Sequence, residues 1–330
     1  MATSQFRLIN SGDAGAPQLY GYSSSLVTVL DYCLITASGW LKPLPNSASV
    51  NELPVLGCYK QPSGSGCTLF INDFSPQATA LGKEAWATGW ETLTTVSAPV
   101  GTGSGQFPYF GQISTNGHIT ICKSATADTI TPRPWFMYVD AYTFYLFIRE
   151  GSGVEKYQSF FFGDIFSYGE TDNYKCMIQG RLVDNGPTGT TNDANDIITG
   201  LTLTFTAASQ GSSGFIQRNY SGRTASPWIS KLGDMGKTTT PAAQLAMLGT
   251  LPLPGINNTL YITPLLIWEP TIIRGKMRGM YHLPYPITSF SDGQIISGSG
   301  EYYGKAFQVV KQGWNAGMWC IEISNTVDTN

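Results

Sequence analysis

Apolar and aromatic residues are densest between residues 133 and 165. Phe, Tyr, Trp and Val dominate three short segments, Arg133–Asp140, Thr143–Phe147 and Phe160–Ile165. Aromatic and β-branched residues at this density are typical of a sheet that is buried on at least one face. The pattern predicts two aromatic strands joined by the polar turn Glu150–Gly153. These segments contain no ligand set, nucleophile or phosphate loop, so they indicate architecture rather than chemistry.

Residues 24–37 show a different periodicity. One apolar stripe follows the i, i+3, i+4, i+7, i+8 spacing of an amphipathic helix, and it consists of Leu26, Val29, Leu30, Cys33 and Leu34. Any of Ser23, Ser24 and Ser25 is suited to cap its first turn, because a Ser oxygen accepts from the unpaired amides there. Gly39 is suited to end it, and Trp40 begins a loop.

Other segments are less distinctive. Val55–Tyr59 and Thr68–Asp73 predict a β-hairpin around a Gly/Ser turn, Ala78–Thr92 predicts a short helix, and Pro99–Gly105 predicts a loop. Further strands are expected at His118–Cys122, Tyr174–Leu182, Leu201–Phe205, Leu260–Ile267, Gln294–Ser297 and Met318–Ser324.

Together these patterns predict a mainly β fold, with β-sandwich-like sheets, Gly/Pro-rich turns and one amphipathic helix near the N-terminus. Residues 184–196 are the most linker-like stretch, rich in Asp, Asn, Gly and Thr. We therefore expect a first domain over residues 1–184, a linker-like loop over 185–197, and a second β-rich domain over 198–330.

Composition narrows the function classes. Charged residues make up 12% of the 330 residues, about half the usual fraction, and aromatic residues also make up 12%. A net charge of −3 argues against general nucleic-acid binding, which needs a basic face. The longest apolar run, Leu260–Trp268, is too short to span a membrane, and the first residues show no signal peptide. Low charge with many Thr, Ser, Gly, Tyr and Trp is typical of β-sandwiches and of proteins whose surfaces are largely covered by partners.

Six scattered cysteines are too few for a disulfide scaffold of this size. Cys58 and Cys67 flank the hairpin turn and are the one pair placed to face each other. Without a secretion signal, reduced thiols are the favoured state, although the oxidation state of this pair stays open.

Catalytic motifs are absent from the sequence. Of the two histidines, His118 follows an Asn-Gly turn and His282 precedes Leu283-Pro284, and neither has a carboxylate or Cys at metal-ligand spacing. Nucleophile-elbow and Walker patterns are missing as well. We expect no catalytic residue, no metal site, no cofactor and no enzymatic activity.

Two alternatives nevertheless remain for carbohydrate chemistry. A glycosidase needs only two carboxylates in one cleft, and four lie near or between predicted strands, namely Asp140, Glu150, Asp164 and Glu170. Sugar binding would use exposed tryptophans, for which Trp86, Trp90 and Trp314 are the candidates. Core and interface roles are the more common use of Trp.

Several of these segments together resemble a family of uncharacterised structural proteins of tailed bacteriophages. The resemblance spans most of the chain and is carried by Gly15–Gly21, Ser25–Leu34, Gly39-Trp40, Lys42-Pro43, Arg133–Trp135, Thr143–Phe147 and Phe161–Tyr168, with weaker echoes in Arg278–Pro284 and Ile323–Asn325.

That resemblance implies a virion component, assembled in the host cytoplasm, whose partners are other virion proteins and copies of itself. Homo-oligomers on the neck or tail would follow from particle symmetry. Capsid decoration, or a lectin-like protein that binds a receptor or a host-surface glycan, is the alternative. We expect Tyr20, Tyr22, Leu26 and Leu30 to supply the subunit contact, and no membrane or nucleic-acid partner.

Overall fold

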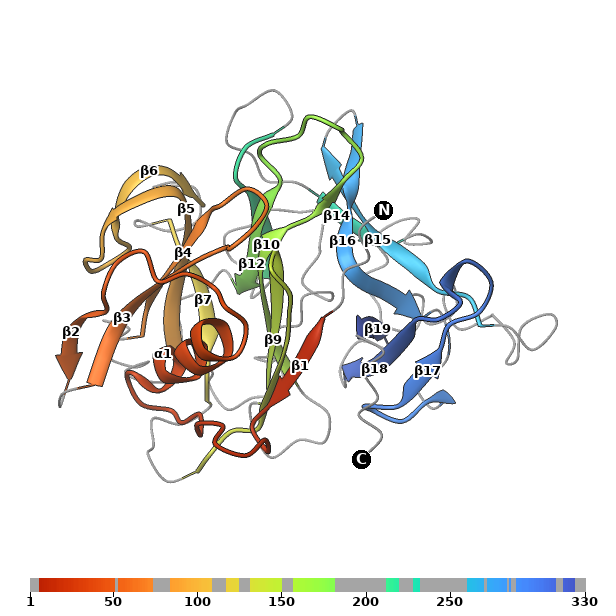
Figure 1. Ribbon diagram of the computed structural model, residues 1–330, viewed down its shortest axis with the longest axis horizontal. Coiled ribbons are helices and arrows are strands. Elements are labelled where there is room, and N and C mark those ends of the chain that lie inside the picture. The colour runs from red at the N-terminus through yellow and green to blue at the C-terminus, as the bar shows by residue number, and fades with distance from the viewer. Residues whose placement is uncertain are drawn as a thin grey trace.

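A computed structural model describes most of the chain. The described residues are 6–50, 53–73, 84–108, 117–124, 131–149, 157–181, 212–219, 228–231, 260–269, 272–283, 285, 289–312 and 317–323. The fold is mainly β, with 53% of the described residues in strands and 8% in helices, which confirms the predicted class. Figure 1 shows two sheets with one short helix packed against the first.

The first sheet has twelve antiparallel strands in the order β1-β8-β9-β10-β12-β7-β5-β4-β3-β2, with β13 beside β12 and β6 beside β5. Its strands are β1 (Arg7–Asn10), β2 (Ser47–Val50), β3 (Leu53–Lys60), β4 (Thr68–Asn72), β5 (Glu84–Thr95), β6 (Thr102–Phe107), β7 (Ile119–Cys122), β8 (Trp135–Val139), β9 (Thr143–Arg149), β10 (Tyr157–Asp164), β12 (Cys176–Arg181) and β13 (Ser212–Ile216).

The second sheet has seven antiparallel strands in the order β14-β15-β16-β19-β18-β17, with β11 beside β16. Its strands are β11 (Phe166–Ser167), β14 (Trp228–Lys231), β15 (Thr263–Glu269), β16 (Ile272–Leu283), β17 (Ile295–Ser297), β18 (Ala306–Gln312) and β19 (Gly317–Ile323), and a 3-10 turn, η4 (Gly300–Tyr302), precedes β18.

The aromatic strands at the centre of the first sheet are buried on both faces. On β9, Phe144 and Leu146 face the helix, whereas Tyr145 and Phe147 pack against the second sheet. Phe161 on β10 also packs against the second sheet. Figure 1 shows these green strands between the helix and the blue second sheet. Double burial explains why their sequences are continuous apolar runs rather than alternating ones, since each face needs its own apolar side chains.

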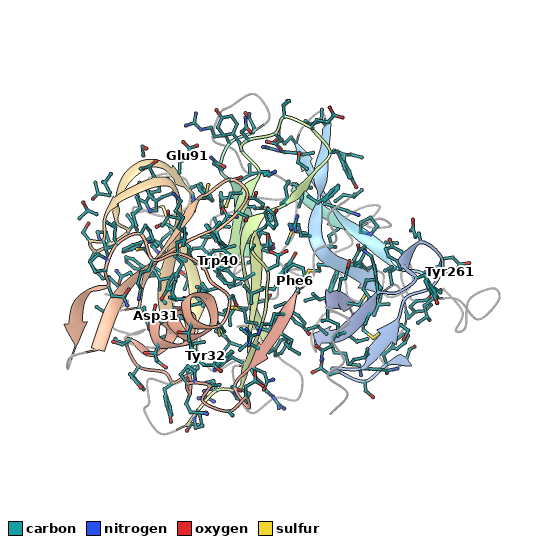
Figure 2. All side chains as sticks on the ribbon, viewed as in Figure 1. Phe6, Asp31, Tyr32, Trp40, Glu91 and Tyr261 are labelled. Atoms are coloured by element: carbon teal, nitrogen blue, oxygen red, sulfur yellow. The ribbon has the colours of Figure 1, made fainter. Side chains whose placement is uncertain are left out.

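The predicted helix is present and has two parts. An α-helix, α1 (Ser25–Leu30), continues into a π-helix, η1 (Asp31–Thr36), and Gly39 follows in the left-handed conformation at φ 70°. All five residues of the predicted stripe are fully buried in the core between helix and sheet. Trp40 closes one end of that core, with its ring edge-on to Phe144 (Figure 2).

The helix is capped by a residue from another part of the chain. Asp73, which follows β4, accepts hydrogen bonds from the Leu26 and Val27 amides at 2.7 and 3.3 Å. The expected Ser cap is wrong, because Ser24 makes no side-chain cap bond, and the Ser25 hydroxyl accepts from the Tyr20 amide. A carboxylate at this position also complements the positive end of the helix dipole.

Asp73 is itself held by a buried lysine. Lys123, just after β7, forms an ion pair with Asp73 and donates at 2.7 Å to the carbonyl of Tyr22. Both charged side chains are fully buried. Burial lowers the pKa of Lys123 and raises the pKa of Asp73, and the contact between them opposes both shifts.

Two local predictions are wrong. Ala78–Thr92 is not a helix where it is described, because β5 begins at Glu84, with Ala85 and Ala87 facing the helix and Trp90 facing the other side. The period is therefore two rather than 3.6. The loop expected at Pro99–Gly105 contains the start of β6. The hairpin of β3 and β4 is confirmed, with Cys58 opposite Phe70.

The division into two domains at residues 185–197 stays a prediction. The expected linker, residues 185–197, lies outside the described residues, as do Leu201–Phe205 and the turn Glu150–Gly153. β13, which follows that linker, pairs with β12 in the first sheet. Phe6 forms a parallel bridge with Ile323 of β19, so both ends of the described chain meet where the two sheets join (Figure 2).

The helix register can be tested by charge substitution. Leu30→Asp should lower the free energy of unfolding by several kcal/mol, because it places an unpaired carboxylate in an apolar core. Thr28→Asp is the matched control, since Thr28 is exposed on the same helix. Denaturant unfolding of both variants gives the comparison. Equal stability of Leu30→Asp and wild type would show that the stripe is not buried.

The ion pair below the helix can be tested separately. Lys123→Met should destabilise the protein by about 3–5 kcal/mol, because the Asp73 carboxylate would be left buried without a counter-charge. Adding Asp73→Asn should restore much of that loss, since no charge remains and the amide oxygen still accepts from the helix. A double variant as unstable as the single one would contradict this account.

Candidate functional site

The first of the candidate carboxylates has a structural role. Asp140 accepts from the amides of Tyr142 and Thr143 at 2.8 and 2.7 Å, in the turn between β8 and β9. Its other oxygen forms an ion pair with Arg278 of β16 at 3.0 Å. The side chain thus fixes a turn and ties it to the second sheet.

Asp164, at the end of β10, is buried beneath the hairpin turn. It accepts from the Gln61 side chain at 3.0 Å and from the Ser65 amide at 2.9 Å. Burial raises the pKa of Asp164, and the hydrogen bonds from Gln61 and Ser65 oppose that shift. Glu170 is exposed, and Glu150 lies outside the described residues. Neither Asp140 nor Asp164 lines the cavity described below.

Both histidines are buried beside tryptophans. The His118 ring stacks on Trp86 with centroids 3.9 Å apart, and His282 lies 5.0 Å from Trp319. Within the described ranges, no group of three or more His, Cys, Asp or Glu residues is placed to hold a metal ion. Cys58 and Cys67 are free thiols and belong to cores on different faces of the first sheet. Cys33, Cys176 and Cys320 are also free thiols.

Two of the three tryptophans expected to stack on sugars, Trp86 and Trp90, are buried. Trp86 and Trp90 are 3% and 4% exposed, so neither ring offers a face to a ligand. Trp90 donates its indole N–H to Thr88 and to the Val100 carbonyl. Trp314 lies outside the described residues.

The residues expected at a subunit contact fall into two groups. Leu26 and Leu30 have no exposed surface and pack under the helix, so this chain itself covers them. Tyr20 and Tyr22 are half-buried and stack on each other at 5.4 Å.

Most of the exposed large apolar side chains among the described residues belong to the second sheet and its connections. Leu41, 51% exposed, is the single large apolar residue that is exposed within the described part of the first sheet and its helix. The remaining exposed large apolar residues belong to the second sheet and its connections, and they are Tyr168, Tyr261, Ile272, Ile273, Ile295 and Tyr303. Tyr303 is the most exposed of them, at 87%.

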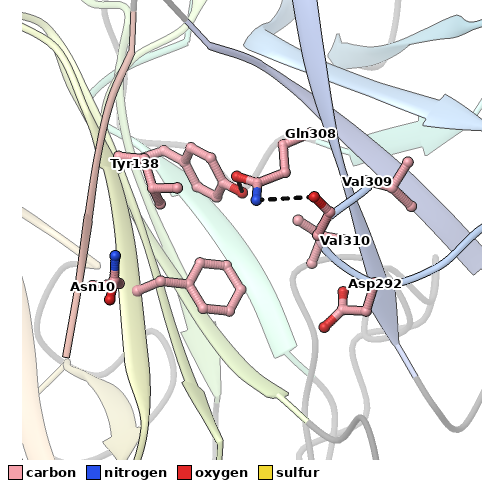
Figure 3. Close-up of a pocket in the computed structure, with 9 residues that line it drawn as sticks. Asn10, Tyr138, Asp292, Gln308, Val309 and Val310 are labelled. Atoms are coloured by element: carbon pink, nitrogen blue, oxygen red, sulfur yellow. Dashed lines mark hydrogen bonds between the residues drawn. The ribbon is translucent and has the colours of Figure 1, made fainter. Parts of the chain in front are cut away.

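One cavity lies where the edges of the two sheets meet (Figure 3). It encloses about 240 Å³ and is lined by Leu8, Asn10, Phe136, Tyr138, Asp292, Gly293, Gln308, Val309 and Val310. The Tyr138 hydroxyl donates to Gln308 at 2.7 Å across the cavity. Sequence reasoning missed this site because its residues come from β1, β8, β18 and the turn before β17, and only the fold brings them together.

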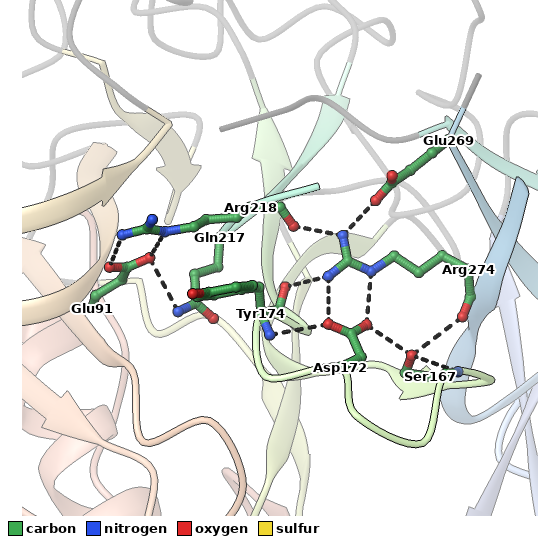
Figure 4. A network of polar contacts seen from close by, with 9 residues as sticks. Glu91, Ser167, Asp172, Tyr174, Gln217, Arg218, Glu269 and Arg274 are labelled. Carbon is green, nitrogen blue, oxygen red and sulfur yellow. Dashed lines mark hydrogen bonds and ion pairs between the residues drawn. The ribbon is translucent and has the colours of Figure 1, made fainter. Parts of the chain in front are cut away.

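A network of charged residues connects the sheets elsewhere (Figure 4). Arg274 of β16 is fully buried and makes a two-pronged contact with Asp172, at 2.8 and 2.7 Å, and an ion pair with Glu269. It also donates to the carbonyls of Tyr174 and Arg218. Bidentate Arg–carboxylate pairs are among the stronger polar contacts in proteins.

The network continues to the first sheet. Arg218, just after β13, pairs with Glu91 of β5 and lies over the ring of Tyr174 at 5.0 Å. Burial by itself would raise the pKa of Asp172, but hydrogen bonds from Arg274 and Ser167 outweigh it and hold that pKa below its usual value. Every charge in this network has a protein partner, so the network holds the two sheets together.

Comparison with known proteins assigns the chain to no family. No model of a known protein family matches the chain, and no curated protein matches it. Among the described residues, no helix is long and apolar enough to span a membrane.

Because Asp172 helps to hold the two sheets together, the free energy of unfolding should depend on pH. Its pKa is lowered in the folded state, so its contribution to stability is complete above the ordinary Asp pKa, about 4, and is lost as pH falls through the folded-state value. Urea unfolding at a series of pH values should show this loss in wild type. Asp172→Asn should reduce the pH dependence and cost about 3 kcal/mol at neutral pH, because Arg274 loses a buried counter-charge.

Glu170→Gln is the control for removing one exposed carboxylate. An unchanged pH dependence in Asp172→Asn would show that other groups control acid unfolding.

Proposed function

We propose that this chain is a structural protein of a tailed bacteriophage virion and forms an oligomeric part of the neck or tail. Its partners are copies of itself and neighbouring virion proteins. The proposal includes the absence of enzymatic activity.

The distribution of exposed apolar residues is the observation that carries the proposal. Ile295 and Tyr303, 61% and 87% exposed, are among six exposed large apolar residues on the described part of the second sheet and its connections, and such residues are available for contact with another protein. Leu41 is the single comparable residue in the described first sheet and its helix. We therefore extend the proposed contact surface to the exposed apolar residues of the second sheet, and the Tyr20/Tyr22 arm stays a predicted contact.

The segments that carry the family resemblance also support a structural role. The arm Gly15–Gly21 runs beside β8, where Leu19 forms a bridge with Arg133 and the Trp135 indole donates to the Pro17 carbonyl. The other strong segments form the helix and the doubly buried strands. Most of these segments contribute to packing, which suits a protein whose task is to hold a shape.

The engagement of the acidic residues supports the non-enzymatic part of the proposal. Asp140 and Asp164 are each held by hydrogen bonds to backbone amides and neighbouring side chains. Turnover of a bacterial polysaccharide that is lost on Asp140→Asn or Asp164→Asn, with folding retained, would overturn it.

The oligomer can be tested with purified protein. Mass photometry and sedimentation should show a defined homo-oligomer in wild type. The double variant Ile295→Ser/Tyr303→Ser should weaken it at least tenfold, because the exposed apolar surface is lost. Leu41→Ser is the matched control, since Leu41 is 51% exposed on the other sheet. Equal weakening by the control, or a wild type that stays monomeric at all concentrations, would contradict the proposed surface.

The proposed position of the chain on the neck or tail can be tested by imaging the virus particle. Cryo-electron microscopy of the virus that encodes the chain should show it as repeated copies around the axis of the neck or tail. Density only at capsomer centres would favour decoration of the shell, and density at a fibre tip with bound sugar would favour the lectin alternative. Absence of the chain from purified particles would overturn the virion role.

A further inference from the structure

We propose that Cys67 and Cys176 are a reactive thiol pair, which small disulfides oxidise to an intramolecular cross-link. Cys67 directly precedes β4, and Cys176 is the first residue of β12. Both side chains belong to the core between the helix and the first sheet, where they are 1% and 0% exposed. Both are free thiols in the structure, which therefore shows the reduced state of the pair.

The turn between β3 and β4 brings Cys67 to the central strands. Asp164, at the end of β10, accepts from the Gln61 side chain at 3.0 Å and from the Ser65 amide at 2.9 Å. The oxygen of the same Gln61 amide accepts from the Cys67 N–H at 3.0 Å. Gly64 lies so close to Asp164 that a side chain at this position would collide with the carboxylate. These contacts hold the residue before β4 against the end of β10.

Strand register places Cys176 at the same point. Cys176 is the partner of Asp164 in the antiparallel pair of β10 and β12. Its thiol makes a hydrogen bond with the Cys67 thiol, and the Gly163 amide donates to the Cys176 sulfur. Sulfurs in hydrogen-bond contact are a short side-chain movement away from the roughly 2.05 Å of a disulfide bond.

Cys58, the partner that the hairpin sequence suggests for Cys67, lies on the other face of the sheet. It stands opposite Phe70 in the β3–β4 pair, and both belong to the core on that face. Its thiol donates to the Leu44 carbonyl at 3.3 Å. The fold therefore replaces a pairing of neighbours in the sequence by a pairing of distant residues.

The oxidation is a thiol–disulfide exchange with a small disulfide such as oxidised glutathione. Cys67 reacts first, because it follows the partly exposed turn at residues 62–66. Its thiol gives a proton to solvent, the thiolate attacks one glutathione sulfur, and the other glutathione leaves and takes up a proton.

The second exchange closes the cross-link. The Cys176 thiol loses its proton, its thiolate attacks the Cys67 sulfur, and the second glutathione leaves as a thiol. Two electrons thus pass from the two cysteines to the reagent. Burial raises the pKa of Cys176, which slows this step while the core stays closed.

The cross-link would tie the β3–β4 hairpin to the centre of the sheet. It closes a loop of about 110 residues, and long loops gain the most from closure, because the unfolded chain loses more conformational freedom. Cytoplasmic thiols stay reduced, whereas surfaces outside the cell are oxidising. Formation after release from the host rests on the proposed virion role, but the chemistry does not, so a monomeric or non-viral chain would leave it standing.

Peptide mapping of the purified wild-type protein tests the pair directly. Trypsin cleaves after Lys60 and Lys175, so Cys58, Cys67 and Cys176 fall in different peptides. After incubation of the folded protein with oxidised glutathione and blocking of free thiols, non-reducing mass spectrometry should show one cross-link, between Cys67 and Cys176. Dithiothreitol should separate the two peptides. Unmodified thiols, glutathione adducts without a cross-link, or a Cys58–Cys67 cross-link would each overturn the proposal.

Melting curves and variants give the second readout. Oxidation should raise the melting temperature of wild type by about 5–10 °C, and dithiothreitol should reverse the rise. Cys67→Ser and Cys176→Ser should each abolish the cross-link and the rise, with Cys176→Ala as the substitute if Cys176→Ser does not fold. Cys58→Ser is the matched control, because Ser can still donate to the Leu44 carbonyl, and it should behave as wild type does. A rise that persists in both Cys67 and Cys176 variants would contradict the assignment.

Discussion

Burial of both faces of the central aromatic strands is the constraint on which the structure depends. A strand such as β9 cannot stand at a surface, because Phe144 and Leu146 need cover on one side and Tyr145 and Phe147 on the other. Each such side chain contributes about 1.5–3 kcal/mol only when water is excluded from it. The helix supplies one cover and the second sheet the other. Without either layer, one face of these strands would expose apolar side chains to water.

Polar contacts between the layers fix their relative orientation. Asp73 and Lys123 hold the helix over its face of the sheet, whereas Arg274 and Asp172 fasten the second sheet on the opposite side. Apolar packing is tolerant of small shifts, but paired buried charges are not, because a displaced partner leaves a costly unpaired charge. The two charge clusters therefore define the orientation of layers that the hydrophobic core brings together.

Sequence reasoning recovered what depends on local pattern. The helical stripe through Leu30 and the β3–β4 hairpin follow from spacing and turn residues alone. Features that depend on distant partners were not recoverable. Asp73 replaced the expected Ser cap from a position far along the chain, and Leu26 proved to be core because a sheet covers the same stripe that a partner subunit could have covered. Ala85 and Ala87 have high helix propensity, and pairing with β4 and β7 overrode it. The cavity combines four separate segments and has no sequence signature.

The parallel bridge between Phe6 and Ile323 can form only after β19 has been synthesised on the ribosome. Among the described residues, the twelve strands of the first sheet lie before residue 217, whereas the strands of the second sheet other than β11 begin at residue 228 or later. A nascent chain can thus complete its first sheet while Tyr145, Phe147 and Phe161 still lack their cover. Until β15, β16, β18 and β19 have been synthesised, that aromatic face stays uncovered, and transiently exposed apolar surface of this kind is prone to aggregation.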